Sequence, residues 1–255
     1  MSAWLSAFPR SIMKKPLFPI LAIVFGVAGY FGNRAGLPVI FLAILWGAFY
    51  FFLIAFFLNW AKEAGATAFV SSYTTRDVVV MAALIAIGGV AKAYWGQLRL
   101  VLEAAIGPYA EFVVGPGFYI WAILACNLIR KPLSGTISMT IGSAVEILAG
   151  NPFGLPVFLF NLWEGFGPDI AYNFIFRNKR YDLLVAIIGG ILSADLGLIY
   201  GWFYFGFANL PALAFIVYVV EVTLSGVAAG IIGYYLAKAL ERIGVKPPAP
   251  AVIKP

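Results

Sequence analysis

Long apolar runs dominate this chain and restrict the folds that it can adopt. About eight of them can cross roughly 30 Å of hydrocarbon at about 1.5 Å of helical rise per residue, and they cover residues 17–32, 37–58, 78–95, 110–129, 133–149, 155–176, 183–206 and 211–237. Charged residues make up 11% of the chain, whereas a soluble domain has about 25%. Since a helix satisfies its own backbone hydrogen bonds in lipid, we predict an all-α fold, a polytopic membrane helix bundle with about eight transmembrane helices.

The basic residues set an orientation for this bundle. If the N-terminus is cytoplasmic, all 17 lysines and arginines lie on the inner side except Arg34, Lys92 and Arg99. Cytoplasmic loops are enriched in Lys and Arg, so the pattern predicts a multi-pass plasma-membrane protein with both termini in the cytoplasm. Lys92 is expected to reach the lipid headgroups or to pair with an acid.

Five carboxylates lie inside stretches that are otherwise almost purely apolar: Glu146, Glu164, Asp169, Asp195 and Glu221. A charge at the centre of a membrane costs about 2.5 to 3.5 kcal/mol or more, so these side chains are expected to face the bundle interior. No Lys, Arg or His lies within a few residues of any of them. They predict an outward-facing acidic pocket for a ligand that is cationic or rich in hydrogen-bond donors.

The outer end of this pocket is expected to carry further acids and aromatic rings. Glu103 and Glu111 fall in the outer segment that joins the third apolar run to the fourth. Glu111 is either a lid over the pocket or a solvated loop charge. The aromatic residues expected near the rim are Tyr94, Trp95, Tyr109, Tyr119, Trp121 and Trp163.

Several functional classes lack their residues in this sequence. It has no histidine, the commonest metal ligand and acid–base catalyst, and its one cysteine, Cys126, cannot form an internal disulfide. It has no G-x-x-x-x-G-K-[ST] run to hold nucleotide phosphates. The net charge of +6 is scattered in short clusters and does not indicate a nucleic-acid partner. We expect no enzyme activity, no metal and no cofactor, and an ATP-driven role would need a separate ATPase.

Four motifs in the second half of the chain carry a family resemblance. They are I-R-K-P at 129–132, E-I-L-A-G-N-P-F-G at 146–154, E-G-F-G-P-D at 164–169 and L-S-G-V-A-A-G-I-I-G at 224–233. In order and spacing they resemble the YkoE-like substrate-binding subunits (S components) of energy-coupling factor (ECF) transporters. The resemblance covers about residues 76–240.

The chain departs from the family pattern at four positions. Leu133 replaces a glycine, Glu164 a glutamine and Asp169 a glutamate, and Glu221 stands where an arginine is expected. The changes at Glu164 and Glu221 add negative charge to the bundle.

The resemblance implies uptake of a vitamin-type ligand, thiamine or its hydroxymethylpyrimidine (HMP) precursor. The implied partners are a transmembrane coupling (T) subunit and cytoplasmic ATPases. The resemblance accounts for a six-helix substrate-binding core (76–240). The two predicted N-terminal transmembrane helices with their cytoplasmic linker (1–75) have no counterpart in the six-helix family pattern, and the composition of the end of the chain predicts a disordered cytoplasmic tail (241–255). Ala82 and Ala86 lie one helical turn apart, and the family's use of small residues on this helix implies that they contact the coupling subunit.

Eight residues are predicted to bind the substrate: Glu146, Glu164, Trp163, Trp121, Asn161, Glu111, Glu221 and Tyr119. A cation over a Trp or Tyr ring gains about 0.5 to 2 kcal/mol, so carboxylates and aromatic faces suit a thiazolium ring. An amino group on the pyrimidine can donate to a carboxylate or an amide oxygen. Either tryptophan could instead be an ordinary packing residue.

The acids also have structural explanations. Glu146 could be a helix-end acid exposed to outer water, and Glu164 could bond to a neighbouring helix through a hydroxyl such as that of Ser138 or Thr140. Asp169 could pair with an arginine, either Arg130 or Arg177.

A second functional class also fits the buried acids. A proton-coupled secondary carrier for a cationic solute would cycle protons on Glu164, Asp195 or Glu221. Asp195 and Glu221 could also stay protonated and merely bridge helices. A membrane enzyme or assembly factor is a third class, for which the sequence shows no catalytic constellation.

Overall fold

The computed structural model describes residues 17–36, 41, 45, 48, 52, 73–204, 211–245 and 247. The chain divides into two compact units, Met1–Ser72 and Tyr73–Pro255. In the first unit, helix α3 covers Leu17–Arg34, where the first apolar run predicted a helix. Most of the second run, 37–58, and nearly all of the tail from residue 246 lie outside the described residues.

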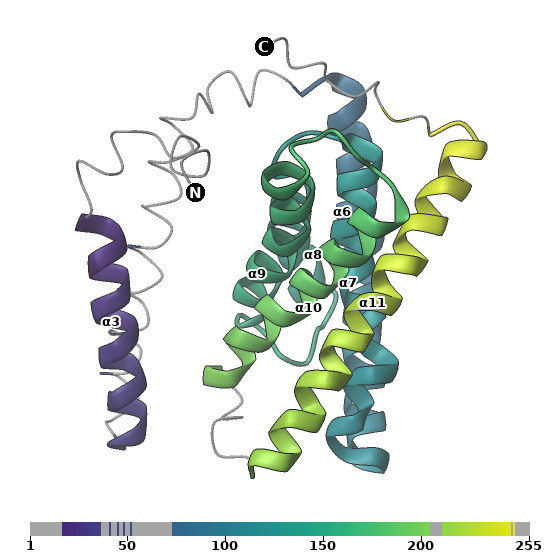
Figure 1. The fold of residues 1–255 in the computed structure, drawn as a ribbon. Coiled ribbons are helices and arrows are strands. Elements are labelled where there is room, and N and C mark those ends of the chain that lie inside the picture. The colour runs from purple at the N-terminus through teal and green to yellow at the C-terminus, as the bar shows by residue number, and fades with distance from the viewer. Residues whose placement is uncertain are drawn as a thin grey trace. The chain divides into compact units, whose positions relative to one another are not determined.

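The second unit is built from helices that Figure 1 labels α6 to α11. They are α6 (Thr75–Ile106), α7 (Ala110–Ile129), α8 (Ser134–Leu148), α9 (Val157–Asp169), α10 (Leu183–Tyr204) and α11 (Ala212–Arg242). A 3-10 turn joins α6 to α7, and a π-helical turn, Ile170–Ile175, continues α9. All regular elements among the described residues are helical, which confirms the all-α class.

Four of the described helices are long and apolar enough to cross a membrane, namely α6, α7, α10 and α11. Helices α8 and α9 are shorter, with 15 and 13 residues. The predicted count of eight membrane spans is therefore not confirmed, although a membrane protein is.

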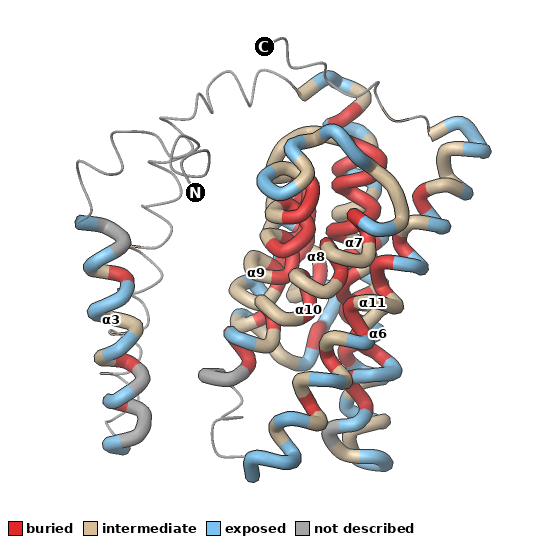
Figure 2. The backbone as a smooth tube through the Cα atoms, in the orientation of Figure 1, coloured by how far each residue is buried: buried red, intermediate tan, exposed pale blue. Residues whose placement is uncertain are grey.

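The six helices of the second unit pack in a closed ring. The order around the ring is α6, α7, α11, α10, α9 and α8, and α8 packs back against α6. Helix α7 also contacts α8, α9 and α10, and its residues 122–129 are all buried (Figure 2). This helix therefore forms much of the core against which the others are placed.

Glycines bring neighbouring helices close together. A Cβ atom on Gly165 of α9 would lie 2.8 Å from the carbonyl oxygen of Gly135 on α8, and one on Gly226 of α11 would lie 2.8 Å from the Cα of Ile191 on α10. Small residues allow such approach between membrane helices. The close contact of α8 and α9 brings together the two helices that carry Glu146 and Glu164.

One end of the bundle gathers most of its basic residues. The Tyr73 hydroxyl donates to the Pro132 carbonyl at 2.8 Å, and Arg130 lies 3.4 Å from Glu241. These contacts join the start of α6, the α7–α8 turn and the end of α11, at the top of the bundle in Figure 1. The residues at this end are Arg76, Arg130, Lys131, Arg177, Lys179, Arg180, Lys238 and Arg242.

Helix α6 extends well past the predicted end at residue 95. Arg99 and Glu103 pair across one helical turn at 2.9 Å, and such pairs stabilise a helix beyond its apolar part. The expectation that Glu103 and Glu111 lie in a connecting segment is therefore wrong. Glu103 is helical, and Glu111 lies in the first turn of α7, where its side chain is buried.

Candidate functional site

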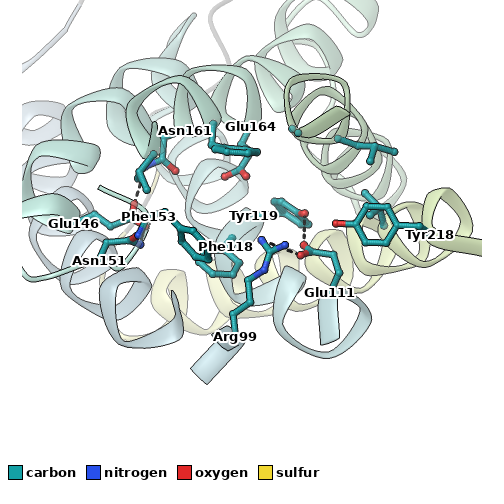
Figure 3. A pocket seen from close by; sticks show the side chains of 16 residues that line it. Arg99, Glu111, Phe118, Tyr119, Glu146, Asn151, Phe153, Asn161, Glu164 and Tyr218 are labelled. Carbon is teal, nitrogen blue, oxygen red and sulfur yellow. Dashed lines mark hydrogen bonds and ion pairs between the residues drawn. The ribbon is translucent and has the colours of Figure 1, made fainter. Parts of the chain in front are cut away.

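All six helices of the second unit contribute to one cavity (Figure 3). Its lining residues lie toward the end of α6, the start of α7 and the end of α8, which is the end of the bundle opposite the basic residues. Its volume is about 50 Å³. The cavity is lined by Arg99 of α6, Glu111, Phe118 and Tyr119 of α7, Glu146 of α8, Asn151 and Phe153 of the α8–α9 connection, Val157, Phe160, Asn161 and Glu164 of α9, Gly197, Leu198 and Gly201 of α10, and Tyr218 and Val222 of α11.

The first polar cluster in the cavity is centred on Glu146. Its carboxylate accepts hydrogen bonds from the side-chain amides of Asn151 at 2.6 Å and Asn161 at 2.7 Å. Lys92 Nζ lies 2.9 Å from Glu146 Oε2 and donates to Asn161 Oδ1 at 2.7 Å. Lys92 and Glu146 are only 1% and 2% exposed, so the alternative of a water-exposed acid at a helix end is wrong. Lys92 pairs with an acid, as one of its two predicted alternatives required.

The second polar cluster is centred on Arg99. Its Nε donates to Glu103 Oε1 at 2.9 Å, and one terminal nitrogen lies 3.2 Å from Glu111 Oε2. Glu111 also accepts a hydrogen bond from the Tyr119 hydroxyl at 2.7 Å. The Tyr218 hydroxyl points toward the same group (Figure 3). Glu111 is thus held between α6 and α7 and faces the cavity.

Glu164 lies between these two clusters and points into the cavity (Figure 3). Its backbone carbonyl accepts a hydrogen bond from Ser193, but its carboxylate has no hydrogen bond or ion pair with any residue that the structure describes. The predicted alternative of a hydroxyl partner is not observed, because Ser138 Oγ and Thr140 Oγ1 also lack partners within the described residues.

Charge is unbalanced in this cavity. Three carboxylates, those of Glu111, Glu146 and Glu164, face it, while two cations, Lys92 and Arg99, pair with the first two. Subtracting two cations from three carboxylates leaves one negative charge if all three are ionised. That site is Glu164, with the rings of Phe118, Tyr119, Phe153 and Phe160 around the cavity.

Five of the eight predicted substrate-binding residues line this cavity: Glu111, Tyr119, Glu146, Asn161 and Glu164. They come from three successive helices, α7, α8 and α9. The structure brings these five side chains to one cavity. Their contact with a substrate stays a prediction.

The other three, Trp121, Trp163 and Glu221, do not line the cavity. Trp121 donates to its own helix at the Gly117 carbonyl, and the Trp163 ring packs at 6.4 Å from Phe166. Successive residues of a helix point about 100° apart. Trp163 and Glu221 are therefore turned by about 100° from their neighbours Glu164 and Val222, which line the cavity. Trp121 lies two residues after Tyr119, about 200° around the helix from it.

Asp169 and Asp195 lie outside the cavity in structural roles. Asp169 is fully buried and accepts hydrogen bonds from the backbone N–H groups of Gly135 and Thr136, and from the Thr136 hydroxyl. It therefore binds the N-terminus of α8, and the predicted pairing with Arg130 or Arg177 is wrong. Asp195 accepts from Thr223 at 3.0 Å and links α10 to α11.

Sequence reasoning missed several cavity residues. The sequence marks Arg99 only as an exception to the charge pattern, and the usable signal is its position on the outer side, four residues before Glu103. Asn151 stood inside the G-N-P motif, and the structure explains its position. Its side chain accepts from Phe153 N at 2.8 Å, which shapes the α8–α9 connection, while its amide binds Glu146. Tyr218 carried no signal that distinguished it from other apolar-run aromatics.

Comparisons with known proteins agree with the helical membrane fold. Residues 76–196 match the family described as the ABC-type cobalt transport system, permease component. The chain is 27% identical over 175 residues to YkoE of Bacillus subtilis (strain 168), a candidate HMP/thiamine permease, with 68% of this chain and 87% of that protein covered. It also matches the crystal structure of an S-component of an ECF transporter, with a TM-score of 0.65, 27% identity, and 68% of this chain and 88% of that chain covered. These matches confirm the resemblance to YkoE-like S components.

Proposed function

We propose that this YkoE-like chain is the substrate-capture subunit of an ATP-driven ECF-type vitamin importer, and that it binds thiamine or HMP in the cavity around Glu164. The observation that carries the proposal is the Glu164 carboxylate, which has no partner among the described residues and lies among aromatic side chains. Glu111 and Glu146 have internal cations, so a cationic ligand would complete the charge balance at Glu164.

The chemistry of thiamine suits these surroundings. A permanently charged thiazolium gains about 0.5 to 2 kcal/mol over an aromatic face, and a charge-assisted hydrogen bond contributes about 1.5 to 3 kcal/mol. Asn161 and Glu146 offer acceptor oxygens for an aminopyrimidine at the other side of the cavity. A ring compound with a positive charge and an amino group would place its charge near Glu164 and its amino group near Asn161 and Glu146.

The proposed topology has eight spans, with two N-terminal helices (1–75) before a six-helix core (76–240), a cytoplasmic tail (241–255) and both termini in the cytoplasm. The cavity then opens outward. The gathering of eight Lys and Arg residues at the end opposite the cavity supports this orientation. Single cysteines at the exposed positions Leu155 and Lys179 test it in intact cells. Labelling by an impermeant reagent is expected only at position 155, and labelling only at 179 would reverse the map.

The proposed partners are a T subunit and cytoplasmic ATPases, with Ala82 and Ala86 of α6 in contact with the T subunit. Both alanines are exposed on the bundle surface. Replacing both by Trp is expected to abolish ATP-driven uptake and to leave ligand binding intact. Loss of binding as well would mean that the two residues serve the fold.

The deciding experiment separates binding from transport. The purified chain alone should bind thiamine or HMP in a calorimetric titration, and proteoliposomes should accumulate the ligand only when the ATPase partners and ATP are present. Accumulation by the chain alone under a pH gradient would instead establish the proton-coupled carrier. If the chain binds neither thiamine nor HMP, the proposed ligand is rejected.

A further inference from the structure

The Arg99 side chain joins three parts of the cavity wall. Its guanidinium contacts Glu103 at 2.9 Å on its own helix and Glu111 at 3.2 Å at the start of α7. The same group lies 5.5 Å from the centre of the Phe153 ring, in the α8–α9 connection. One cation thus holds α6, α7 and the α8–α9 connection together at the edge of the cavity (Figure 3).

The two carboxylates that contact Arg99 differ in their surroundings. The Glu103 side chain is 35% exposed and lies one turn along the same helix, whereas the Glu111 side chain is 4% exposed and faces the cavity. Arg99 can therefore release Glu111 and still keep Glu103, because the second contact depends only on α6. The side chain thus contacts two carboxylates at once, Glu111 inside the cavity wall and the more exposed Glu103 on its own helix.

A guanidinium also has the chemical features expected of the ligand. It is a flat cation with several N–H donors, and it stacks on aromatic rings. In the structure it uses the Glu111 carboxylate and the Phe153 ring, which both line the cavity. The remaining volume of about 50 Å³ accommodates roughly three to five water molecules at about 10 to 15 Å³ each, so a two-ring ligand needs space that these side chains fill.

We propose that the Arg99–Glu111 ion pair is a latch, in which Arg99 occupies the place of a cationic ligand and competes with it for Glu111. Ligand entry transfers Glu111 from Arg99 to the ligand, leaves Arg99 on Glu103, and frees the α8–α9 connection at Phe153. The latch selects for ligands whose charge can replace that of Arg99. The identity of the ligand in this inference rests on the proposed function.

The test uses two variants that should change affinity in opposite directions. Thiamine is titrated calorimetrically into the full-length chain in detergent. Arg99→Met removes the competing cation and is expected to bind thiamine about three- to tenfold more tightly, as for a binding-competent state populated at roughly 10 to 30%. Glu103→Gln removes the rim position of Arg99, favours the latch and should weaken binding. Weaker binding by Arg99→Met would overturn the latch, because it would make Arg99 a ligand contact or a support of the fold.

A ligand-free measurement keeps the latch testable on its own. Hydrogen exchange of residues 149–157 should rise in Arg99→Met and fall in Glu103→Gln, and a change of the same sign in both would overturn the proposal. If the wild-type chain and both variants bind neither thiamine nor HMP, the proposed function fails, and the exchange result still decides the latch. Should Arg99→Met not fold, Arg99→Lys retains the charge but loses the planar guanidinium that contacts Glu111 and stacks on Phe153, so it should also raise exchange.

Discussion

Asp169 and Glu164 are buried carboxylates on one short stretch of chain, and their surroundings assign them opposite roles. Asp169 accepts hydrogen bonds from two backbone N–H groups and a hydroxyl at the start of α8, and it is 0% exposed. Glu164, five residues earlier, has no such donor among the described residues and faces the cavity. A buried carboxylate that is fully hydrogen bonded belongs to the fold, whereas one without donors is available to a ligand.

The largest expected effect is a loss of stability when the Asp169 side chain is removed. Asp169→Ala leaves several buried donors at the start of α8 without an acceptor, and each lost bond to a charged group is worth about 1.5 to 3 kcal/mol. We expect the free energy of unfolding to fall by about 3 to 4 kcal/mol, measured by denaturant titration in detergent. Asp169→Asn retains one acceptor oxygen and should lose less. If Asp169→Ala were as stable as wild type and bound ligand more weakly, the assigned roles would be reversed.

Glu146 tests whether a carboxylate that pairs with an internal cation stabilises the fold, as Asp169 does, or is available to a ligand, as Glu164 is. Glu146→Leu leaves Lys92 buried without its anion, and breaking such a pair costs about 3 kcal/mol or more. Lys92→Met in addition removes the orphaned charge, so the double variant should recover much of the lost unfolding free energy. A double-mutant cycle measures this coupling. Additive losses would mean that Lys92 and Glu146 act independently and that Glu146 resembles Glu164 instead.

Glu164→Gln gives the complementary result. Because no donor of the described protein is lost, the unfolding free energy should not fall. Thiamine affinity should drop about tenfold to a hundredfold, since a charge-assisted contact contributes about 1.5 to 3 kcal/mol. Unchanged affinity would make Glu164 a neutral hydrogen-bonding group, as the glutamine of the related family would be. Unchanged affinity in Glu164→Leu as well would remove it from the site.

The sequence predicted the helical class and the importance of the buried acids, because both depend on local polarity. Residues 110–129 form α7 at the predicted bounds, and Glu164 was identified from its apolar surroundings alone. Partners from distant segments could not be predicted in this way. Lys92 meets Glu146 across α6 and α8, 54 positions apart in sequence, and the direction of Trp163 depends on which face of α9 packs inward.

Asp169 also has partners that its local sequence could not predict. Its apolar surroundings resembled those of Glu164, and the donors that distinguish it belong to Gly135 and Thr136 at the start of another helix. Backbone donors carry no signal in the sequence. The sequence therefore identifies the buried acids, but it does not decide which of them stabilise the fold and which face a ligand site.

The smallest expected effect concerns the space that Glu164 occupies. A Cβ atom on Gly197 of α10 would lie 3.1 Å from Glu164 Cγ, so Gly197→Ala should displace that side chain by a few tenths of an ångström without removing its charge. Alanine gains up to about 1 kcal/mol over glycine inside a helix, and stability should not fall. Affinity should drop about two- to fivefold, or about 0.4 to 1 kcal/mol.

Gly142→Ala on α8 is the matched control for this substitution. Its added Cβ would meet only the Ile85 carbonyl at 4.0 Å, and Gly142 does not line the cavity. It should therefore leave thiamine affinity unchanged. If affinity drops for Gly197→Ala and not for Gly142→Ala, ligand binding depends on the position of the Glu164 carboxylate as well as on its charge. Equal affinity in both variants would mean that the ligand does not depend on where the carboxylate lies, and Glu164 would then act at longer range through its charge.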